Sequence, residues 1–163
     1  MPEKGVLDLI RAAGRLRGDF TLLLSGGGAL EDEMRRLAVE VDVADRLRIV
    51  RSIPHADIPR HINCMDMLVL PSYTVPHWKE QFGQVLVQAM ASEVPVLGST
   101  HAEIPREIGD ARLTYEERNT EQLLEKMQRL LDSPALRTEF AEKGRRRVLE
   151  QYTNTCIADR TYE

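Results

Sequence analysis

Short apolar runs alternate with amphipathic segments of helix length along this chain. The runs are FTLLLS (20–25), RIV (48–50), MLVLPS (67–72) and VPVLG (94–98), with RLTY (112–115) as a weaker fifth. Strands that are almost continuously apolar are typical of a parallel sheet that is buried on both faces. The sequence therefore predicts an α/β fold, in which helices cover both faces of a parallel sheet.

Apolar residues recur at helical spacing in the segments between these runs. We expect helices at 6–16, 29–41, 56–63, 119–132 and 134–151, and a further one that begins after Gly83. The first helix precedes the first strand, although a doubly wound fold normally begins with a strand. We therefore expect that the first strand of the sheet is missing upstream. The domain itself is predicted at 1–151, followed by a polar tail at 152–163.

Composition excludes several classes of protein. With 163 residues, 42% of them hydrophobic, the chain is long enough for one domain with its own core. A net charge of -4 gives no basic surplus for nucleic acid or anionic membranes, so neither is expected as a partner. The chain has neither an apolar stretch of membrane-spanning length nor the layout of a signal peptide, which predicts a cytoplasmic protein. Cys64 and Cys156 lie far apart without a CxxC pattern, so we expect free thiols and no metal site.

Three glycines follow the first predicted strand, in SGGG at 25–28. In open parallel sheets ligands bind beyond the carboxyl ends of the strands, so this turn is a candidate site. The glycines would let a ligand approach the backbone closely, or they would let the strand pack tightly on the next helix. The segment lacks the GK[ST] of a P-loop and does not complete GxGxxG. Both interpretations of the glycines stay open on the sequence alone.

The stretch EQFGQVLVQAMA, at 80–91, is more specific. Gly83 at a helix start would leave several backbone N–H groups unpaired and directed outward, where phosphate or sugar oxygens could accept hydrogen bonds. Glu80, in the preceding loop, could accept hydrogen bonds from hydroxyl groups bound beside it. The arrangement suits a nucleotide-sugar.

At these residues the chain resembles a known family. The matching blocks are EKGVLDLIRAAGRL (3–16), LLLSGGG (22–28), MDMLVLPS (65–72), EQFGQVLVQAMASEVPVLGS (80–99) and EIPREIGDARL (103–113). They are similar to the C-terminal, donor-binding domain of the retaining GT-B glycosyltransferases of the family 4 type, the glycosyl transferases group 1. The resemblance covers nearly the whole chain and implies a Rossmann-like domain. It also implies transfer of a hexose from a nucleotide diphosphate sugar with retention, without an obligatory metal or other cofactor.

The resemblance assigns roles to single positions. Lys4, in EKG, matches the lysine that neutralises the leaving diphosphate, and Glu80 matches the first acid of the family's E-x7-E motif, which holds donor-sugar hydroxyls. These two are the implied catalytic residues. The remaining implied positions contact the phosphates, the sugar, the base or the ribose of the donor. They are Gly26, Gly27 and Gly28 at the phosphates, Phe82, Gly83, Gln84 and Val85 at the sugar and distal phosphate, Ser52 and Ile53 at the base, and Gln88 at the ribose.

The chain also departs from the family pattern. Gln88 stands in place of the second motif acid, so a neutral amide would replace a charged acceptor. Glu93, Ala102 and Arg112 stand at usual glycine positions, where each could add backbone strain. The arginine that normally precedes EKG would lie upstream of Met1, together with the acceptor-binding half. A separate acceptor-binding chain or self-association is the partner that this absence suggests.

Two alternatives remain beside the glycosyltransferase. A non-catalytic nucleotide-sugar-binding remnant or interaction module is suggested by the same departures. A nicotinamide-dependent dehydrogenase is suggested by SGGG, but no acidic residue ends the next strand, RIV. Among residues near the predicted site, His77 and His101 are interpreted as surface or turn residues. Trp78 would either stack on a base or sugar, or cover an edge of the core.

Overall fold

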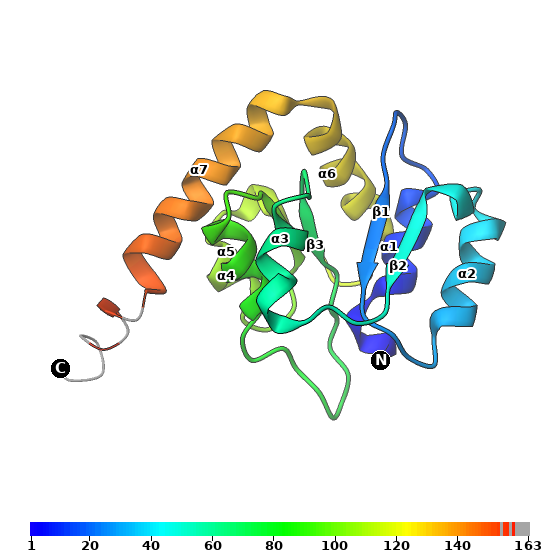
Figure 1. The fold of residues 1–163 in the computed structure, drawn as a ribbon, viewed down its shortest axis with the longest axis horizontal. Helices are drawn as coiled ribbons and strands as arrows, with labels where there is room; N and C mark the ends of the chain where they lie inside the picture. Colours follow the sequence, from blue (N-terminus) through cyan, green and yellow to red (C-terminus); the bar gives the residue numbers. More distant parts are fainter. Residues whose placement is uncertain (154, 157, 159–163) are drawn as a thin grey trace.

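The computed structural model describes residues 1–153, 155, 156 and 158 of the chain (Figure 1). Its strands are β1 (Leu22–Ser25), β2 (Leu47–Val50), β3 (Leu68–Leu70), β4 (Val96–Ser99) and β5 (Thr114–Tyr115). Its helices are α1 (Val6–Ala13), α2 (Glu31–Glu40), α3 (Ile58–Ile62), α4 (Gln84–Ala91), α5 (Ile104–Ile108), α6 (Thr120–Asp132) and α7 (Pro134–Gln151). Short 3-10 helices lie at Pro2–Lys4 (η1), Ala44–Arg46 (η2), His55–Asp57 (η3) and Ala111–Leu113 (η4). The predicted α/β fold is confirmed.

All the strand pairs are parallel, and they form two separate sheets. One sheet has the order β1-β2, and the other has the order β3-β4-β5. Within the described residues, no hydrogen-bonded ladder joins β1 to β3, and the two strands lie apart in Figure 1. Neither β1 nor β3 pairs with a further strand on the side that faces the other sheet, within the same described residues.

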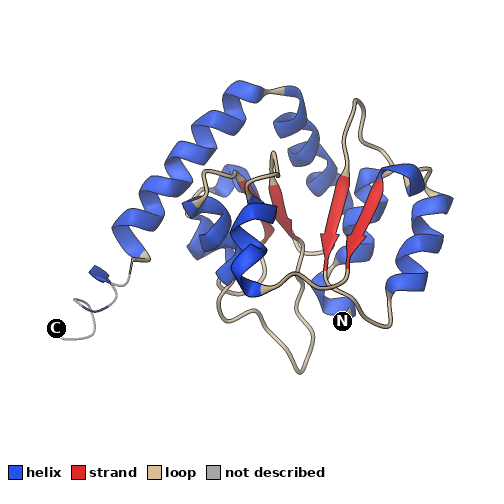
Figure 2. Cartoon of the chain, in the orientation of Figure 1, coloured by secondary structure: helices blue, strands red, loops and turns tan. Residues whose placement is uncertain are grey.

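Helices surround the strands, which lie in the interior (Figure 2). The helix α1 packs on α2 and α6, and α4 packs on α7. Apolar side chains from all parts of the chain form one buried core. Its fully buried members include Ile10, Leu86, Leu97, Ile104 and Leu123. Burial of this apolar surface is the main favourable contribution to folding.

Two helices are followed by a residue other than glycine that has left-handed backbone. After α4, Glu93 has φ 57°, its N–H donates to the Met90 carbonyl, and the Val94 N–H donates to the Ala89 carbonyl. This is the Schellman motif, which usually has glycine at the left-handed position. After α2, Asp42 (φ 59°) makes the equivalent turn. The prediction that Glu93 occupies a glycine-type conformation is confirmed, and Ala102, with φ 47°, shares it.

The first residue after α7 packs against the core. Tyr152, just after α7, is half-buried against the core, and residues 154, 157 and 159–163 of the predicted polar tail lie outside the described residues. No helix within the described ranges combines the length and the apolar character that a membrane span needs. Cys64 and Cys156 are both free.

Candidate functional site

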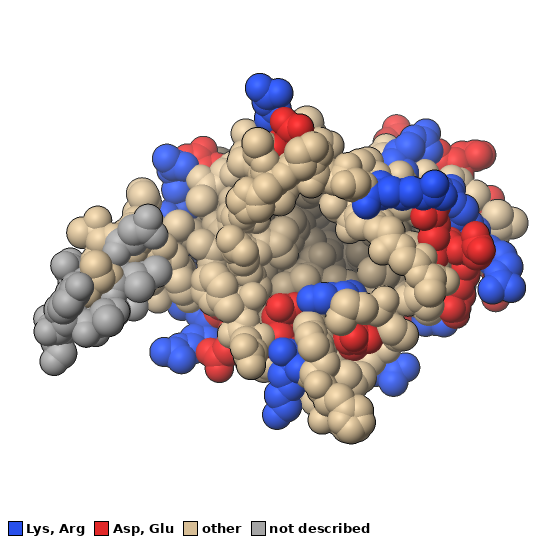
Figure 3. Space-filling model, turned by 60° about the horizontal axis from the view of Figure 1, so that its bottom comes forward, with Lys and Arg blue, Asp and Glu red and all other residues tan. Residues whose placement is uncertain are grey.

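The predicted site residues follow the carboxyl ends of the strands. Figure 3 turns this side of the molecule forward and shows that its surface is hollowed in the middle, with acidic and basic side chains beside the hollow. The glycine turn follows β1, the segment with Ser52 and Ile53 follows β2, and the loop with Glu80 follows β3. Parallel strands bring these loops, which are far apart in the sequence, to one edge of the fold.

Lys4 and Glu80 form an ion pair across this edge. The Lys4 Nζ lies 2.7 Å from Glu80 Oε2, and 37% of the lysine side chain and 15% of the glutamate side chain are exposed. Gly5 allows the chain just after η1 to lie against the Pro71 carbonyl. It has φ +67°, and a Cβ on it would lie 1.9 Å from the Pro71 carbonyl oxygen. The structure thus brings together the two residues that the resemblance assigns to catalysis.

The glycine turn is open to solvent. Gly26 has φ +119°, and a Cβ added to Gly26 or Gly28 would meet no atom within 4 Å. Tight packing of strand on helix therefore does not explain these two glycines. What remains of the two interpretations is an exposed backbone that a ligand could approach.

An ion pair that sequence reasoning missed lies next to this turn. Arg51 lies beside Gly27, since a Cβ added to this glycine would be 3.8 Å from the Arg51 Cβ. The Nε and Nη2 of Arg51 donate to the Glu31 carboxylate at 2.9 and 3.0 Å. Hydrogen bonds from Arg51 and Arg35 lower the pKa of Glu31 to about 2. The pair ties the start of α2 to the loop after β2. The two partners are 20 residues apart and follow no local pattern, so they could not be paired from the sequence.

The start of α4 differs from the prediction of outward-directed N–H groups. The Gly83 N–H donates to both carboxylate oxygens of Glu107, at 2.8 and 3.0 Å, and the Gln84 N–H donates to the Phe82 carbonyl at 3.0 Å. The prediction is wrong for the Gly83 N–H because a carboxylate from α5 occupies the helix start, and for the Gln84 N–H because it donates back to the Phe82 carbonyl. A Cβ on Gly83 would lie 2.7 Å from Glu107 Oε2, so only glycine leaves room for this contact. A lone acid on the apolar face of IPREI was the signal that could have identified Glu107.

The other predicted donor-binding residues lie around these groups. Gln88 is half-buried in the second turn of α4, and Val85 is half-buried in the first. Ser52 is exposed, and Ile53 is half-buried. Phe82 is 48% exposed, and its ring centroid lies 6.1 Å from that of Tyr152, at the end of α7.

The interpretation of His101 as a surface or turn residue is wrong. Its side chain is fully buried, and its Nε2 accepts a hydrogen bond from the Glu80 backbone N–H at 2.8 Å. Trp78 stacks on the His101 ring, with centroids 5.4 Å apart, and the Lys4 Nζ lies 4.3 Å from the Trp78 ring centroid. Trp78 therefore covers buried groups, in line with the second of its two predicted roles. His77 is exposed, as expected.

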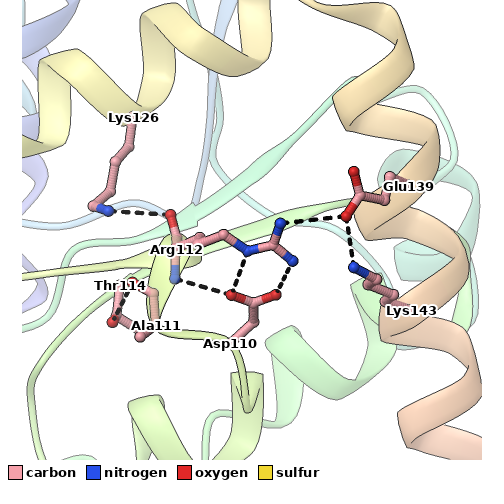
Figure 4. A network of polar contacts seen from close by, with 7 residues as sticks. All are labelled: Asp110, Ala111, Arg112, Thr114, Lys126, Glu139 and Lys143. Atoms are coloured by element: carbon pink, nitrogen blue, oxygen red, sulfur yellow. Dashed lines mark hydrogen bonds and ion pairs between the residues drawn. The ribbon is translucent and has the colours of Figure 1, made fainter.

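Arg112 does not carry the strain that its glycine-type position suggested. It lies in η4 and is not among the residues with positive φ. Its guanidinium instead pairs with Asp110 (Nη2 to Oδ2, 2.6 Å) and Glu139 (Nη1 to Oε1, 3.3 Å), as Figure 4 shows. The arginine thus joins the turn before β5 to α7. In the part of the chain that the structure describes, no three His, Cys, Asp or Glu side chains gather where they could hold a metal ion.

Comparison with known proteins places this geometry in a family. Residues 1–147 match the model of the glycosyl transferases group 1. The chain is 28% identical over 166 aligned positions to a GDP-mannose-dependent monoacylated alpha-(1-6)-phosphatidylinositol monomannoside mannosyltransferase of Corynebacterium glutamicum, covering 98% of this chain and 43% of that protein.

Solved structures agree. Sucrose-phosphate synthase from Thermosynechococcus elongatus is 26% identical with a TM-score of 0.83, over 99% of this chain and 41% of that one. The C-terminal domain of LpcC, a glycosyl transferase group 1 family protein from Francisella tularensis, shares the fold with a TM-score of 0.82 at 23% identity, over 94% of this chain and 82% of that one. The chain thus spans less than half the length of the curated relative and matches a C-terminal domain. It belongs to the glycosyl transferases group 1 and has the fold of the C-terminal domain of a GT-B glycosyltransferase.

Proposed function

We propose that this chain binds a nucleotide diphosphate sugar and supplies the donor-binding half of a retaining hexosyltransferase. The observation that carries the proposal is the Lys4–Glu80 ion pair, which lies at the carboxyl edge of the strands, the edge that also carries the exposed turn Gly26–Gly28. A cation and an open glycine backbone at one edge match the diphosphate of such a donor, and the acid beside them matches its sugar hydroxyls.

Lys4 has the role of stabilising charge on the diphosphate. Its Nζ carries three donors and uses one of them for Glu80, so it can hold the acid and a phosphate oxygen at once. Charge that develops on the leaving group is then met by a preorganised cation, which lowers the barrier without requiring a metal ion.

Glu80 has the role of orienting the sugar. Its side chain is largely buried and pairs with Lys4, and its backbone N–H donates to His101. A carboxylate accepts hydrogen bonds from hydroxyl groups more strongly than a neutral acceptor does. The acceptor substrate and the groups that face the anomeric carbon belong, in this proposal, to a separate domain or chain.

The names of relatives mention different donors and products, including a GDP-mannose-dependent mannosyltransferase and an alpha-D-kanosaminyltransferase. These names do not agree on one donor, so the donor of this chain has to be found by measurement. A second candidate, a non-catalytic donor-binding module, is favoured by one observation, the neutral Gln88 in place of an acid.

Titration calorimetry with GDP-mannose, UDP-glucose and UDP-N-acetylglucosamine tests the proposal. We expect one of them to bind, and we expect Lys4→Ala and Glu80→Gln to weaken binding at least tenfold, since each removes a charge-assisted contact. Lys79→Ala and Glu125→Gln are matched controls, because both side chains are exposed and lie outside the proposed site. Equal affinity of Lys4→Ala and Lys79→Ala would contradict the role of Lys4. Binding without transfer, even after addition of an acceptor-binding domain, would favour the non-catalytic module.

A further inference from the structure

His101 lies where three loops meet. It follows β4, and its fully buried side chain contacts the loop after β3 through Thr74 and Glu80, and the loop after β5 through Glu117. Its own backbone N–H donates to Ser99 Oγ at 3.3 Å, and that hydroxyl donates to the Ser72 carbonyl. A polar ring buried at such a junction stabilises one arrangement of the loops only if both of its nitrogens find partners.

The hydrogen bond from Glu80 fixes the protonation of the ring. The backbone N–H of Glu80 can only donate, so Nε2 of His101, 2.8 Å away, must be unprotonated. A neutral imidazole then carries its proton on Nδ1. That nitrogen lies 2.9 Å from Thr74 Oγ1, which accepts the Nδ1 proton.

The series of hydrogen bonds that starts at His101 Nδ1 ends at a carboxylate. The Thr74 hydroxyl donates to Glu117 Oε1 at 2.8 Å, and the Thr74 backbone N–H donates to Glu117 Oε2 at 2.6 Å. Partial burial acts to raise the pKa of Glu117, but the hydrogen bonds from Thr74, together with the nearby His101, lower it overall. An ionised Glu117 accepts both bonds from Thr74, and this orients the hydroxyl so that its lone pairs face His101.

A second route links His101 to Lys4. The Trp78 ring stacks on His101 at an interplanar angle of 21°, and Lys4 Nζ lies over Trp78. Lys4 in turn pairs with the Glu80 side chain. The backbone of Glu80 is therefore held through His101, and its side chain is held through a lysine that contacts the tryptophan stacked on the same ring.

We propose that His101 is a positioning residue for Glu80: the neutral ring, with its proton on Nδ1, holds the Glu80 backbone in place, and protonation of Nε2 releases it. A proton on Nε2 would face the Glu80 N–H, and two donors cannot share a hydrogen bond. The charged groups that face the ring from the surrounding elements are Glu117, Glu80 and Lys4. The consequence for donor binding rests on the proposed function.

Two substitutions at position 101 separate the hydrogen bond from the packing. His101→Phe keeps a ring that can stack on Trp78 but removes the acceptor, and we expect donor affinity to fall roughly tenfold because the Glu80 N–H loses its partner. His101→Gln places an amide oxygen within reach of the Nε2 position and should recover most of that affinity. His77→Phe, in the same loop as Glu80 but exposed, is the control. Equal losses for His101→Phe and His101→Gln would overturn the proposal.

The dependence on pH gives a readout that packing alone would not move. As the pH falls and His101 takes up a proton, wild type should lose donor affinity, and His101→Gln should lack this component. The same pH dependence in both proteins would assign it to another group and contradict the release step.

Nitrogen NMR of the ligand-free protein tests the inference even if no donor binds. At high pH the ¹⁵N shifts of His101 should show an unprotonated Nε2 and a protonated Nδ1, and the Glu80 amide signal should move with the His101 titration. Failure to bind any nucleotide-sugar, together with this NMR result, would reject the proposed function and leave the positioning of Glu80 intact. A proton on Nε2 at high pH, or a Glu80 amide signal that does not change during the titration of His101, would reject the positioning role itself.

Discussion

The backbone N–H of Gly83 donates to both carboxylate oxygens of Glu107, so a buried acid from α5 closes the amino end of α4. The contact satisfies a helix N–H that would otherwise lack an intrahelical partner. It also places a carboxylate in a buried position, where the charged form is disfavoured. Burial raises the pKa of Glu107 above its ordinary value of 4.5, and the hydrogen bonds from Gly83 offset this only in part.

This pKa shift predicts how the stability of the chain depends on pH. Between 4.5 and the raised pKa the folded state binds a proton that the unfolded chain has released, so the free energy of unfolding falls as the pH rises through this window. In Glu107→Gln this contribution is absent. The stability of the variant relative to wild type should therefore increase with pH across the window and become constant above it.

Urea unfolding at a series of pH values measures this difference. The same subtraction for Glu125→Gln controls for the removal of one carboxylate from an exposed position. A relative stability of Glu107→Gln that decreases with rising pH would mean that the pKa of Glu107 is lowered.

The left-handed residue after α4 gives a second prediction. Glu93→Gly should stabilise the fold by about 1 kcal/mol relative to Glu93→Ala, since only glycine adopts this backbone without strain. The comparison with alanine removes the exposed ion pair to Arg145 (3.2 Å) from both variants. Asp42 occupies the equivalent position after α2. The difference in the free energy of unfolding between Asp42→Gly and Asp42→Asn should be smaller, because asparagine tolerates this conformation better than alanine does. Equal denaturant midpoints for Glu93→Gly and Glu93→Ala would show that the strain at position 93 is negligible.

The amide at position 88 gives a third prediction. If Gln88 accepts a hydrogen bond from the ribose of the donor, Gln88→Glu should tighten donor binding, because a charged acceptor contributes roughly 1.5–3 kcal/mol where a neutral one contributes 0.5–1.5. Calorimetry with the donor found to bind wild type measures the change. Asn63→Asp, an amide-to-acid change at an exposed position after α3, tests whether any added charge would have the same effect. An unchanged donor affinity of Gln88→Glu would show that the side chain at position 88 does not contact the ribose.

The open edges of β1 and β3 give a fourth prediction. Unpaired strand edges favour pairing with other chains, so we expect this chain to be marginally stable and to self-associate as its concentration rises. An amino-terminal extension that contains an apolar strand and an arginine should fill the gap, raise the melting temperature and suppress association. Sedimentation velocity over a range of concentrations, with and without the extension, provides the measurement. A monomer of high melting temperature that the extension leaves unchanged would show that the edges need no partner.

Regular elements were predictable from the sequence, whereas several polar contacts of the site were not. The run FTLLLS and the periodicity of 134–151 led directly to β1 and α7, because burial of apolar side chains determines both patterns. His101 was missed because a histidine in a loop sequence is usually exposed, and its burial depends on loops from different strands meeting at one edge, which no local pattern encodes. Glu107 was missed because no helix was predicted over 104–108, so its position on the apolar face of α5 was not recognised. Arg112 was misjudged because the family comparison supplied a backbone conformation that this chain does not adopt.

The separation of the two sheets has a consequence for the cooperativity of folding. Because no strand ladder in the described residues joins β1 to β3, the part with β1 and β2 is connected to the rest by packing, chiefly of α1 on α6, and by single polar contacts such as Lys4–Glu80 and the Tyr73 N–H to the Glu3 carbonyl. Such contacts can loosen without breaking any backbone ladder. Segments of a protein that are coupled in this way can open as separate units, each with its own free energy of opening. We therefore expect the Gly26–Gly28 turn and Glu80 to open in different units, so that the two sides of the proposed donor site need not be ordered at the same time.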